Sequence, residues 1–175
     1  MYTLEIILIS IVLFGVFSIV WYTVKTGISP MPSSSKAYKT ILEHAEVKGE
    51  GAIIDLGSGW GTLVVAFARK YPHKQVIGYE LSLLPWFFSV LRKNLLGLSN
   101  LHIYRRNFFN ADLKAAGLLV CYLFPKGMSK LKQKLNVDDI HVNIVSNTFV
   151  VPDSDAIMKI SLDDTFHTPI YFYRI

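Results

Sequence analysis

A glycine-rich turn directly after a short apolar run is the feature that most limits how this chain can fold. Residues 52–55 (Ala-Ile-Ile-Asp) are typical of a buried strand, and Asp-Leu-Gly-Ser-Gly-Trp-Gly follows at 55–61. Glycines permit a sharp turn and let backbone N–H groups approach a ligand closely. A segment with one apolar helical face begins at once, over 62–70. Strand, glycine turn and helix in that order predict an α/β fold that binds a ligand at the turn.

Strand-like and helix-like segments alternate along the rest of the chain. The expected strands are 52–55, 75–79, 101–104, 117–124, 140–145, 156–162 and 169–174, and the expected helices are 36–46, 62–70, 82–94 and 127–135. Serines are expected to cap the helix at 36–46, and Ser82 the helix at 82–94. This order predicts a Rossmann-like α/β fold with seven strands, mostly parallel, and helices on both faces. The last two strands have no helix between them, so one should run antiparallel.

An apolar segment precedes this domain. From Ile6 to Val24 there are 19 residues without a charge, enough at ~1.5 Å per residue to cross roughly 30 Å of hydrocarbon. Trp21 and Tyr22 stand at its end, where amphipathic rings prefer the membrane interface. We expect a single transmembrane helix over 1–25. The alternatives are a cleaved signal peptide, which usually has a basic start and a small-residue cleavage site, and a buried soluble helix.

The charges on either side of the apolar segment predict its orientation. Only Glu5 precedes it, whereas three lysines follow by position 39. Basic flanks stay in the cytoplasm, so we expect a single-pass membrane protein whose domain is cytoplasmic. A linker over 26–35, with two prolines and four serines, should separate the anchor from one domain over 36–175.

The spacing of the glycines distinguishes between ligands. Gly57, Gly59 and Gly61 follow the pattern G-x-G-x-G, whereas the dinucleotide fingerprint is G-x-G-x-x-G. A NAD-dependent enzyme is therefore disfavoured, and the chain lacks the P-loop pattern of NTPases. Glu80 ends the second expected strand, 19 residues after Gly61. A carboxylate at that edge of the sheet can accept hydrogen bonds from both hydroxyls of a ribose.

These segments resemble class I S-adenosylmethionine-dependent methyltransferases. Residues 55–61 resemble their motif I, and Gly-Tyr-Glu-Leu at 78–81 resembles the acidic residue that follows it. A Pro-x-Pro-Ser before the first domain helix, Leu-x-Pro-x-x-Met at 123–128 and the run at 162–173 are similar to a narrower family. That family contains small membrane-anchored protein-lysine methyltransferases, whose mitochondrial members modify the ATP synthase c subunit or the adenine nucleotide translocase. The resemblance covers residues 32–175.

The resemblance implies a binding site for S-adenosylmethionine. Its residues would be Asp55, Gly57, Ser58, Gly59, Gly61, Glu80, Leu81, Asn107 and Phe108. Glu80 would hold the ribose hydroxyls, and Leu81 would touch the adenine. The superfamily often has an acid where this chain has Asn107, whose amide oxygen would accept the adenine amino group without a charge. Phe108 would either stack on the adenine or pack in the core.

The fourth expected strand ends in Tyr-Leu-Phe-Pro at 122–125, which is the substrate edge in the superfamily. Phe124 and Pro125 are the candidate acceptor-side residues, although Pro125 also suits an ordinary turn. The Asp/Asn-Pro-Pro-aromatic tetrapeptide of amino-DNA methyltransferases is missing, so we expect no nucleic-acid substrate. No general base stands out, and the catalytic residues remain unknown. Methyl transfer to a neutral amine needs mainly alignment and the loss of one proton.

We therefore expect methyl transfer to a lysine amine of a protein, with membrane proteins as candidate substrates. Two alternatives stay open: a small or lipid-like acceptor, and a non-catalytic adaptor that retains the cofactor fold. Five histidines lack the spacing of metal ligands, and the single cysteine, Cys121, falls in an apolar strand. We expect neither a metal site nor a disulfide framework.

Overall fold

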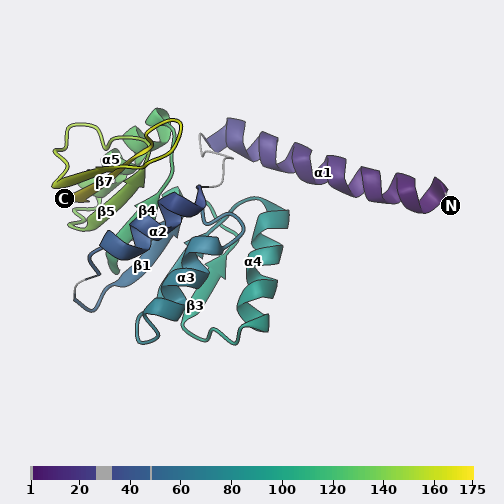
Figure 1. Cartoon of the computed structure of the whole chain (residues 1–175), viewed down its shortest axis with the longest axis horizontal. Helices are drawn as coiled ribbons and strands as arrows, with labels where there is room; N and C mark the ends of the chain where they lie inside the picture. Colours follow the sequence, from purple (N-terminus) through teal and green to yellow (C-terminus); the bar gives the residue numbers. More distant parts are fainter. Residues whose placement is uncertain (1, 27–32, 48) are drawn as a thin grey trace.

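The computed structural model describes residues 2–26, 33–47 and 49–175. Its elements are, in order, α1 (Tyr2–Thr26), α2 (Ser35–His44), β1 (Ala52–Leu56), α3 (Thr62–Lys70), β2 (Val76–Tyr79), α4 (Leu83–Leu95), β3 (Leu101–Tyr104), η1 (Phe108–Asn110), β4 (Ala116–Cys121), α5 (Pro125–Val137), β5 (Asn143–Asn147), β6 (Met158–Ser161) and β7 (Pro169–Arg174). Figure 1 shows a layered α/β body from which α1 projects, with the N-terminus far from the sheet.

The seven strands form one sheet in the order β3-β2-β1-β4-β5-β7-β6. β1 to β5 run parallel, and β7 pairs antiparallel with both β5 and β6. The predicted mostly parallel sheet with one antiparallel C-terminal strand is confirmed. The chain first builds outward from β1 to β3 and then returns to place β4 on the other side of β1. The strand order therefore reverses between β1 and β4, which is where ligands bind in open α/β sheets.

Helices cover both faces of this sheet. Successive strand residues point to opposite faces, so neighbouring Ile53 and Ile54 enter different hydrophobic clusters. Ile53 packs in the cluster that contains α2 and α3 residues such as Phe67. Ile54 packs in the cluster that contains Met128 and Leu131 of α5. The site is thus built on a sheet whose central strands are buried on both sides.

Several element boundaries differ from the prediction: for example, the strand expected at 156–162 is Met158–Ser161 and the helix expected at 127–135 is Pro125–Val137. The strand expected over 117–124 ends at Cys121, because Phe124 is the extended N-cap of α5 and Pro125 occupies its first turn. Proline suits that position since a first-turn N–H has no partner within the helix. The strand expected at 140–145 is instead Asn143–Asn147. Pairing with β4 and β7 sets its register. Ile140 and Val142 are buried just before the strand, and their apolar pattern led to a predicted start that is too early.

The two predicted serine caps have different outcomes. Ser34 Oγ accepts a hydrogen bond from the backbone N–H of Ala37 at 3.1 Å, so a serine caps α2 as expected. Ser82 occupies the N-cap position of α4, but its side chain makes no capping bond. Its backbone N–H instead donates to Glu80 Oε1 at 2.7 Å. The start of α4 is therefore tied to the end of β2 rather than capped by the serine hydroxyl.

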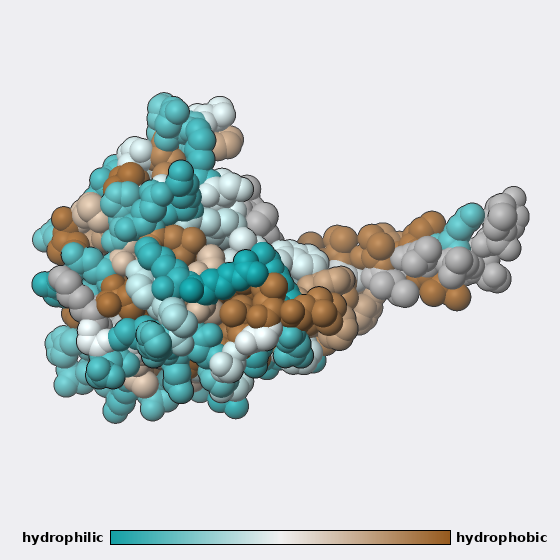
Figure 2. Space-filling view, turned by 60° about the horizontal axis from the view of Figure 1, so that its bottom comes forward, coloured by the Kyte–Doolittle hydropathy of each residue, from teal (hydrophilic) through white to brown (hydrophobic). Residues whose placement is uncertain are grey.

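The N-terminal segment is helical, as expected, and its described side chains are largely apolar and exposed. The large hydrophobic residues at least half exposed are Ile6, Ile7, Ile9, Val12, Leu13, Phe14, Val16, Phe17, Val20 and Trp21. Figure 2 shows this projecting helix and further hydrophobic surface on the body beside it. Over the described ranges, however, no helix qualifies by length and hydropathy as a membrane span. The transmembrane assignment of 1–25 is thus not supported by the structure, and positions 27–32 of the expected linker lie outside the described residues.

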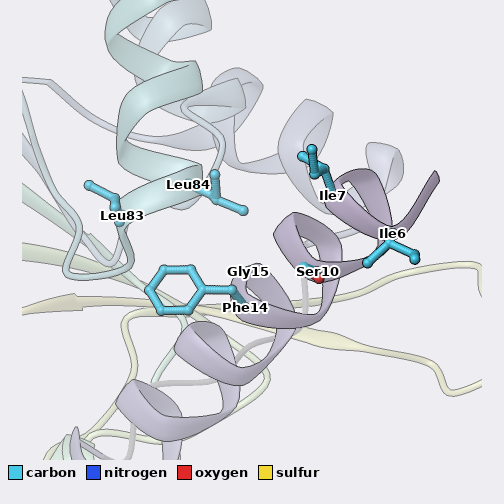
Figure 3. Close-up of a pocket in the computed structure, with 7 residues that line it drawn as sticks. All are labelled: Ile6, Ile7, Ser10, Phe14, Gly15, Leu83 and Leu84. Carbon is cyan, nitrogen blue, oxygen red and sulfur yellow. The ribbon is translucent and has the colours of Figure 1, made fainter. Parts of the chain in front are cut away.

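α1 touches the body at the first turn of α4. Gly15 is buried there, and a Cβ at this position would lie 2.3 Å from Leu84 Cδ1. Beside this contact is a cavity of about 360 Å³ lined by Leu83 and Leu84 of α4 and by α1 residues that include Ile7 and Phe14. Figure 3 shows these side chains converging from the two helices. The middle of α1 and the beginning of α4 therefore share one apolar contact.

The Asn100 side chain hydrogen-bonds to the end of α3 and to the loop between α3 and β2. Its Nδ2 lies 3.0 to 3.2 Å from the carbonyl oxygens of Ala68, Tyr71 and Lys74. The Asn100→Ala change removes the donor from these carbonyls and should lower the free energy of unfolding by roughly 1–3 kcal/mol. Urea unfolding of the full chain measures the loss. Asn94→Ala, on an exposed helix position, is the control and should shift stability by less than about 0.5 kcal/mol. Equal stability of the two variants would contradict the assignment.

Candidate functional site

The glycine loop after β1 folds against the end of β2. The backbone N–H groups of Gly57 and Ser58 both donate to the Tyr79 carbonyl oxygen, at 3.0 and 2.9 Å. Gly57, Gly59 and Gly61 have φ values of 104°, 53° and 76°, in the region that side chains disfavour. At Gly59 a Cβ would meet no described atom within 4 Å. The backbone conformation, and not crowding, therefore calls for glycine there, and the loop has open space over it.

Gly61 brings the start of α3 against α4. A Cβ at Gly61 would lie 2.7 Å from Cβ of the fully buried Ser89. A side chain at position 61 would therefore push the two helices apart as well as strain the backbone. The close approach fixes the glycine loop between β1, β2 and α4.

Glu80 connects three elements through one carboxylate. Its Oε2 accepts a hydrogen bond from the Gly59 N–H at 2.9 Å, and its Oε1 accepts from the Ser82 N–H at 2.7 Å. A carboxylate has about four acceptor positions, so both oxygens retain capacity for further donors. The predicted role of Glu80, accepting two ribose hydroxyls, is compatible with this geometry.

Ser58 supplies a polar group without a protein partner. Its Oγ is buried and, among the described side chains, makes no hydrogen bond. It lies against Gly78 of β2, where an added Cβ would be 2.7 Å from that oxygen. A buried hydroxyl without a partner is unfavourable, and a bound polar ligand would satisfy it. Together with the open space over Gly59, this makes the loop fit a cofactor with polar groups. Gly78 stood in the sequence motif, but its role as the space for Ser58 was not predictable.

Asp55 lies at the carboxyl end of β1 and is only 7% exposed. Burial raises the pKa of its carboxyl group to about 7, and the nearby Glu80 carboxylate adds to the rise. Tyr38 of α2 lies close enough for the Asp55 charge to raise the pKa of its phenol, after the larger effect of burial. Tyr38 also hydrogen-bonds with the Thr62 side chain and the Ser33 backbone. Sequence reasoning missed Tyr38 because α2 carries no motif that points to the site.

The three residues predicted to lie near the adenine differ in their burial and in their contacts. Leu81 is partly buried next to Glu80. Asn107 Oδ1 accepts a hydrogen bond from the Phe109 N–H at 3.0 Å and so caps η1. Phe108 is 1% exposed and packs in the core cluster on the α5 face. The cofactor contacts of these three residues stay predictions.

An aromatic group stands at the carboxyl ends of β4 and β5. The Phe149 ring centroid lies 6.0 Å from that of Tyr122 and 5.6 Å from that of Phe124. Phe124 is half-buried, and the adjacent Pro125 is exposed at the start of α5. The structure thus adds Tyr122 and Phe149 to the acceptor-side candidates. Phe149 was missed because it comes from the next strand and follows no motif.

A strained turn positions Phe149. Thr148 has φ of 68°, which is uncommon for a β-branched residue and is a feature of functional sites. Its Oγ1 donates to Asn147 Oδ1 at 3.1 Å, and the Asn147 amide donates to Ser33 Oγ at 2.8 Å. Asn147 is 2% exposed. This network ties the segment before α2 to the acceptor edge of the sheet.

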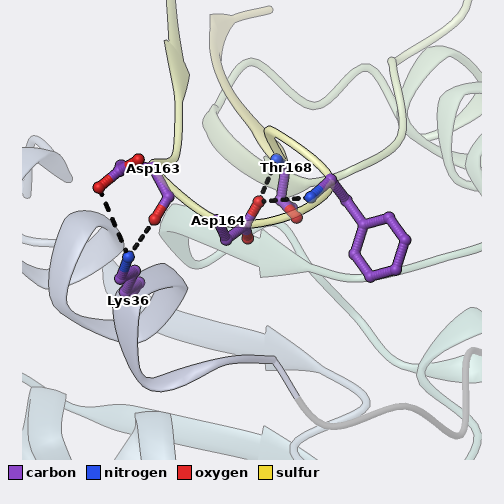
Figure 4. A network of polar contacts seen from close by, with 5 residues as sticks. Lys36, Asp163, Asp164 and Thr168 are labelled. Carbon is purple, nitrogen blue, oxygen red and sulfur yellow. Dashed lines mark hydrogen bonds and ion pairs between the residues drawn. The ribbon is translucent and has the colours of Figure 1, made fainter.

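The loop between β6 and β7 is fastened to the start of α2, as Figure 4 shows. Lys36 Nζ donates to the Asp163 carbonyl oxygen and lies 3.8 Å from Asp163 Oδ2. Asp164 Oδ1 accepts from the backbone N–H groups of Phe166 and Thr168, and hydrogen bonds with Thr168 lower the pKa of this carboxyl group. The C-terminal run that resembles the family therefore packs near the segment that carries Ser33 and Tyr38.

The described part of the chain contains no candidate metal site. Within the described ranges, no group of three or more His, Cys, Asp or Glu residues is placed to hold a metal ion. Cys121 is buried, and burial raises the pKa of its thiol to about 12. A thiol with such a pKa is unreactive at neutral pH.

The Asp55→Asn variant should stabilise the ligand-free chain most at alkaline pH. The folded-state pKa of about 7 exceeds the value of about 4 in an unfolded chain, so stability falls as the pH rises through 7. Asparagine cannot ionise and avoids this loss. Because the loss falls between about pH 4 and pH 7, the gain in unfolding free energy over the parent should widen by roughly 2.6 kcal/mol between pH 5 and pH 8. Urea unfolding at several pH values measures it, and a gap that stays constant with pH would show that Asp55 does not titrate in this range.

Comparisons with known sequences give a family and a relative. The ANTKMT methyltransferase domain family matches residues 55–157. A protein from Saccharolobus islandicus (strain REY15A) named protein-lysine N-methyltransferase is 24% identical over 151 residues, which are 83% of this chain and 92% of that protein.

Solved structures show the same fold. An RNA methyltransferase from Salinibacter ruber in complex with S-adenosyl-L-homocysteine superposes with a TM-score of 0.73 at 22% identity, covering 83% of this chain and 94% of that one. A SAM-dependent methyltransferase from Aquifex aeolicus gives 0.61 at 11% identity, covering 78% and 88%. The expected class I fold is confirmed, and S-adenosylmethionine is the cofactor that the site and the family share. The chain belongs to the ANTKMT methyltransferase family.

Proposed function

We propose that this enzyme methylates the side-chain amine of a lysine in a protein substrate. The observation that carries the proposal is the aromatic group of Tyr122, Phe124 and Phe149, which follows β4 and β5. It lies at the same edge of the sheet as the glycine loop, since β4 pairs in parallel with β1. The name of the Saccharolobus relative supports the same acceptor. Bound S-adenosylmethionine supplies an activated methyl group on a positively charged sulfur.

The chain's own residues would hold the cofactor from three sides. Glu80 accepts hydrogen bonds from the ribose hydroxyls and keeps the hydrogen bond from the Gly59 N–H. Ser58 Oγ gains the partner that it lacks in the protein alone. Asp55, once ionised, balances the positive charge of the ligand in a site where burial makes an unpaired carboxylate unfavourable. The cofactor-binding roles of Gly57, Gly61, Leu81, Asn107 and Phe108 belong to the same proposal.

The aromatic rings suit the acceptor. A lysine side chain is a flexible alkyl stem with a terminal amine, and aromatic rings pack on the apolar stem. Burial among rings also lowers the pKa of an amine, so the lysine can release its proton to solvent and expose a lone pair. Phe124 and Pro125 would then align the amine with the methyl group, since alignment supplies most of the catalysis for a strong nucleophile.

We further propose that α1 anchors the enzyme to a membrane in a single pass, with the domain on the cytoplasmic side. Support comes from the 19 uncharged residues between Ile6 and Val24 and from the lysines after them. The exposed apolar side chains of α1 are what a hydrocarbon environment would cover. Membrane-embedded proteins with lysines near the bilayer surface would be the natural substrates.

Replacing Glu80 with alanine should remove cofactor binding while leaving the fold. The change deletes the ribose acceptor and frees the N–H groups of Gly59 and Ser82, so affinity should fall at least 100-fold, since hydrogen bonds to charged groups contribute about 1.5–3 kcal/mol each. Calorimetric titration of the full chain with S-adenosylmethionine measures this, with NAD as the ligand control. Glu50→Ala, at an exposed loop position, should bind normally. Binding retained by Glu80→Ala would place the cofactor elsewhere.

The Phe149→Ala variant should lose methyl transfer but keep cofactor binding. The enzyme is incubated with methyl-labelled S-adenosylmethionine and membrane proteins, and the labelled residue is identified by mass spectrometry. We expect label on lysine, at least tenfold less with Phe149→Ala and near-normal amounts with Phe149→Tyr, which keeps the ring. Phe166→Ala, at an 88% exposed site, is the control. Label found in the lipid fraction, or activity unaffected by Phe149→Ala, would contradict the lysine acceptor or the aromatic site respectively.

A further inference from the structure

α4 carries an apolar face that the rest of the domain leaves uncovered. Its buried residues are Pro85 and Ser89. On the other side are Leu83, Phe87, Phe88, Leu91 and Leu95, which are 37 to 77% exposed. Trp60 of the glycine loop extends this surface, with its ring centroid 5.4 Å from that of Phe88. Contiguous apolar surface of this kind marks an interaction site.

The charged residues of α4 and of the chain segments next to it in sequence have one sign. The sequence contains no Asp or Glu between Glu80 and Asp112, whereas Arg92, Lys93, Arg105 and Arg106 fall in that interval. Arg92 and Lys93 occupy the last turn of α4. An apolar helix face that ends in cations is the pattern of helices that lie in the interface of an anionic bilayer. The charge therefore favours phospholipid over an apolar groove of another protein.

The same face continues onto α1. Leu84 packs on Gly15, and both helices line the cavity of about 360 Å³ in Figure 3. In Figure 2 the hydrophobic surface of the body lies beside the projecting helix. The first turn of α4 and the part of α1 around Gly15 therefore form one continuous apolar surface.

We propose that α4 and Trp60 form a second membrane-contacting surface, distinct from α1. The first two turns of α4 enter the apolar layer, and Arg92 and Lys93 lie among anionic headgroups. Trp60 belongs to the cofactor loop, and Ser82 at the start of α4 is bonded to Glu80. The cofactor pocket is thereby held at the bilayer surface. This contact is independent of the methyl acceptor and goes beyond the proposed methyl transfer.

Spin labels on single cysteines of the full chain test the contact. Cys121 is buried with a pKa of about 12 and will not compete for the reagent. Labels are placed by Phe87→Cys and Leu91→Cys, with Val137→Cys on α5 and Phe166→Cys in the β6–β7 loop as controls, at sites 77% and 88% exposed. Collision rates with oxygen and with an aqueous nickel chelate are measured on vesicles of phosphatidylcholine and phosphatidylglycerol in a 7:3 ratio.

On vesicle-bound chain, nickel collisions at positions 87 and 91 should fall at least fivefold and oxygen collisions should rise, more at 87 than at 91. At the control positions 137 and 166, both collision rates should stay at their values in buffer. Labels at 87 and 91 that remain as accessible to nickel as in buffer, while the chain sediments with vesicles through α1, would overturn the proposal and leave this face to a protein partner. Protection and label–label broadening without vesicles would overturn it in favour of a second copy of the chain.

A second experiment tests whether Arg92 and Lys93 contribute to vesicle binding. The double variant Arg92→Gln/Lys93→Gln should bind these vesicles roughly 30-fold more weakly, since each basic residue near an anionic surface contributes about 1 kcal/mol. Lys126→Gln/Lys130→Gln, with the same charge change on exposed α5 positions, is the matched control and should change binding less than twofold. Equal losses in the two variants would show attraction by overall charge and overturn the assignment to α4.

Discussion

The hydrogen bonds between the Glu80 carboxylate and the N–H groups of Gly59 and Ser82 are the interaction on which the rest of the site depends. They join the end of β2, the loop after β1 and the beginning of α4 at one point. Asp55 pairs with Gly78 in the parallel ladder, and this register fixes the position at which the loop leaves the sheet. Because Gly78 has no side chain, Ser58 can approach β2 closely. A carboxylate suits this position because charged acceptors make the stronger hydrogen bonds to backbone donors.

Holding two carboxylates close together makes the ligand-free site electrostatically unfavourable. Asp55 is buried and interacts with Glu80, so the pKa of its carboxyl group rises to about 7. Near neutral pH this group is divided between its protonated and ionised forms. The proposed cationic cofactor would relieve this repulsion by pairing with the ionised form, and that relief would add to its binding free energy. Sites built for ligand binding commonly sacrifice stability in this way.

The fold, and the proposed cofactor side of the site with it, could be predicted from sequence because their signals are local. The glycine turn at 55–61 and Glu80 each follow a short apolar strand, and neighbouring parallel strands bring their carboxyl ends together. The acceptor half could not be predicted, because it depends on contacts between distant segments. Phe149 meets Phe124 only once β5 lies beside β4, and the strained Thr148 has no sequence signature. The predicted Ser82 cap does not form, and Pro85, in the first turn of α4, has no N–H to donate to the Ser82 hydroxyl.

The N-terminal segment connects to the pocket at two separate places. At one, Asn147 and Ser33 fasten the chain before α2 to the acceptor edge, and Tyr38 of α2 reaches the surroundings of Asp55. At the other, Gly15 of α1 packs on Leu84, four residues after Glu80. α1 itself makes the second of these contacts, whereas the first belongs to the segment that leads into α2. In the proposed function, α1 would therefore act on the cofactor side of the site through α4, and the segment before α2 would act on the side of the rings of Tyr122, Phe124 and Phe149.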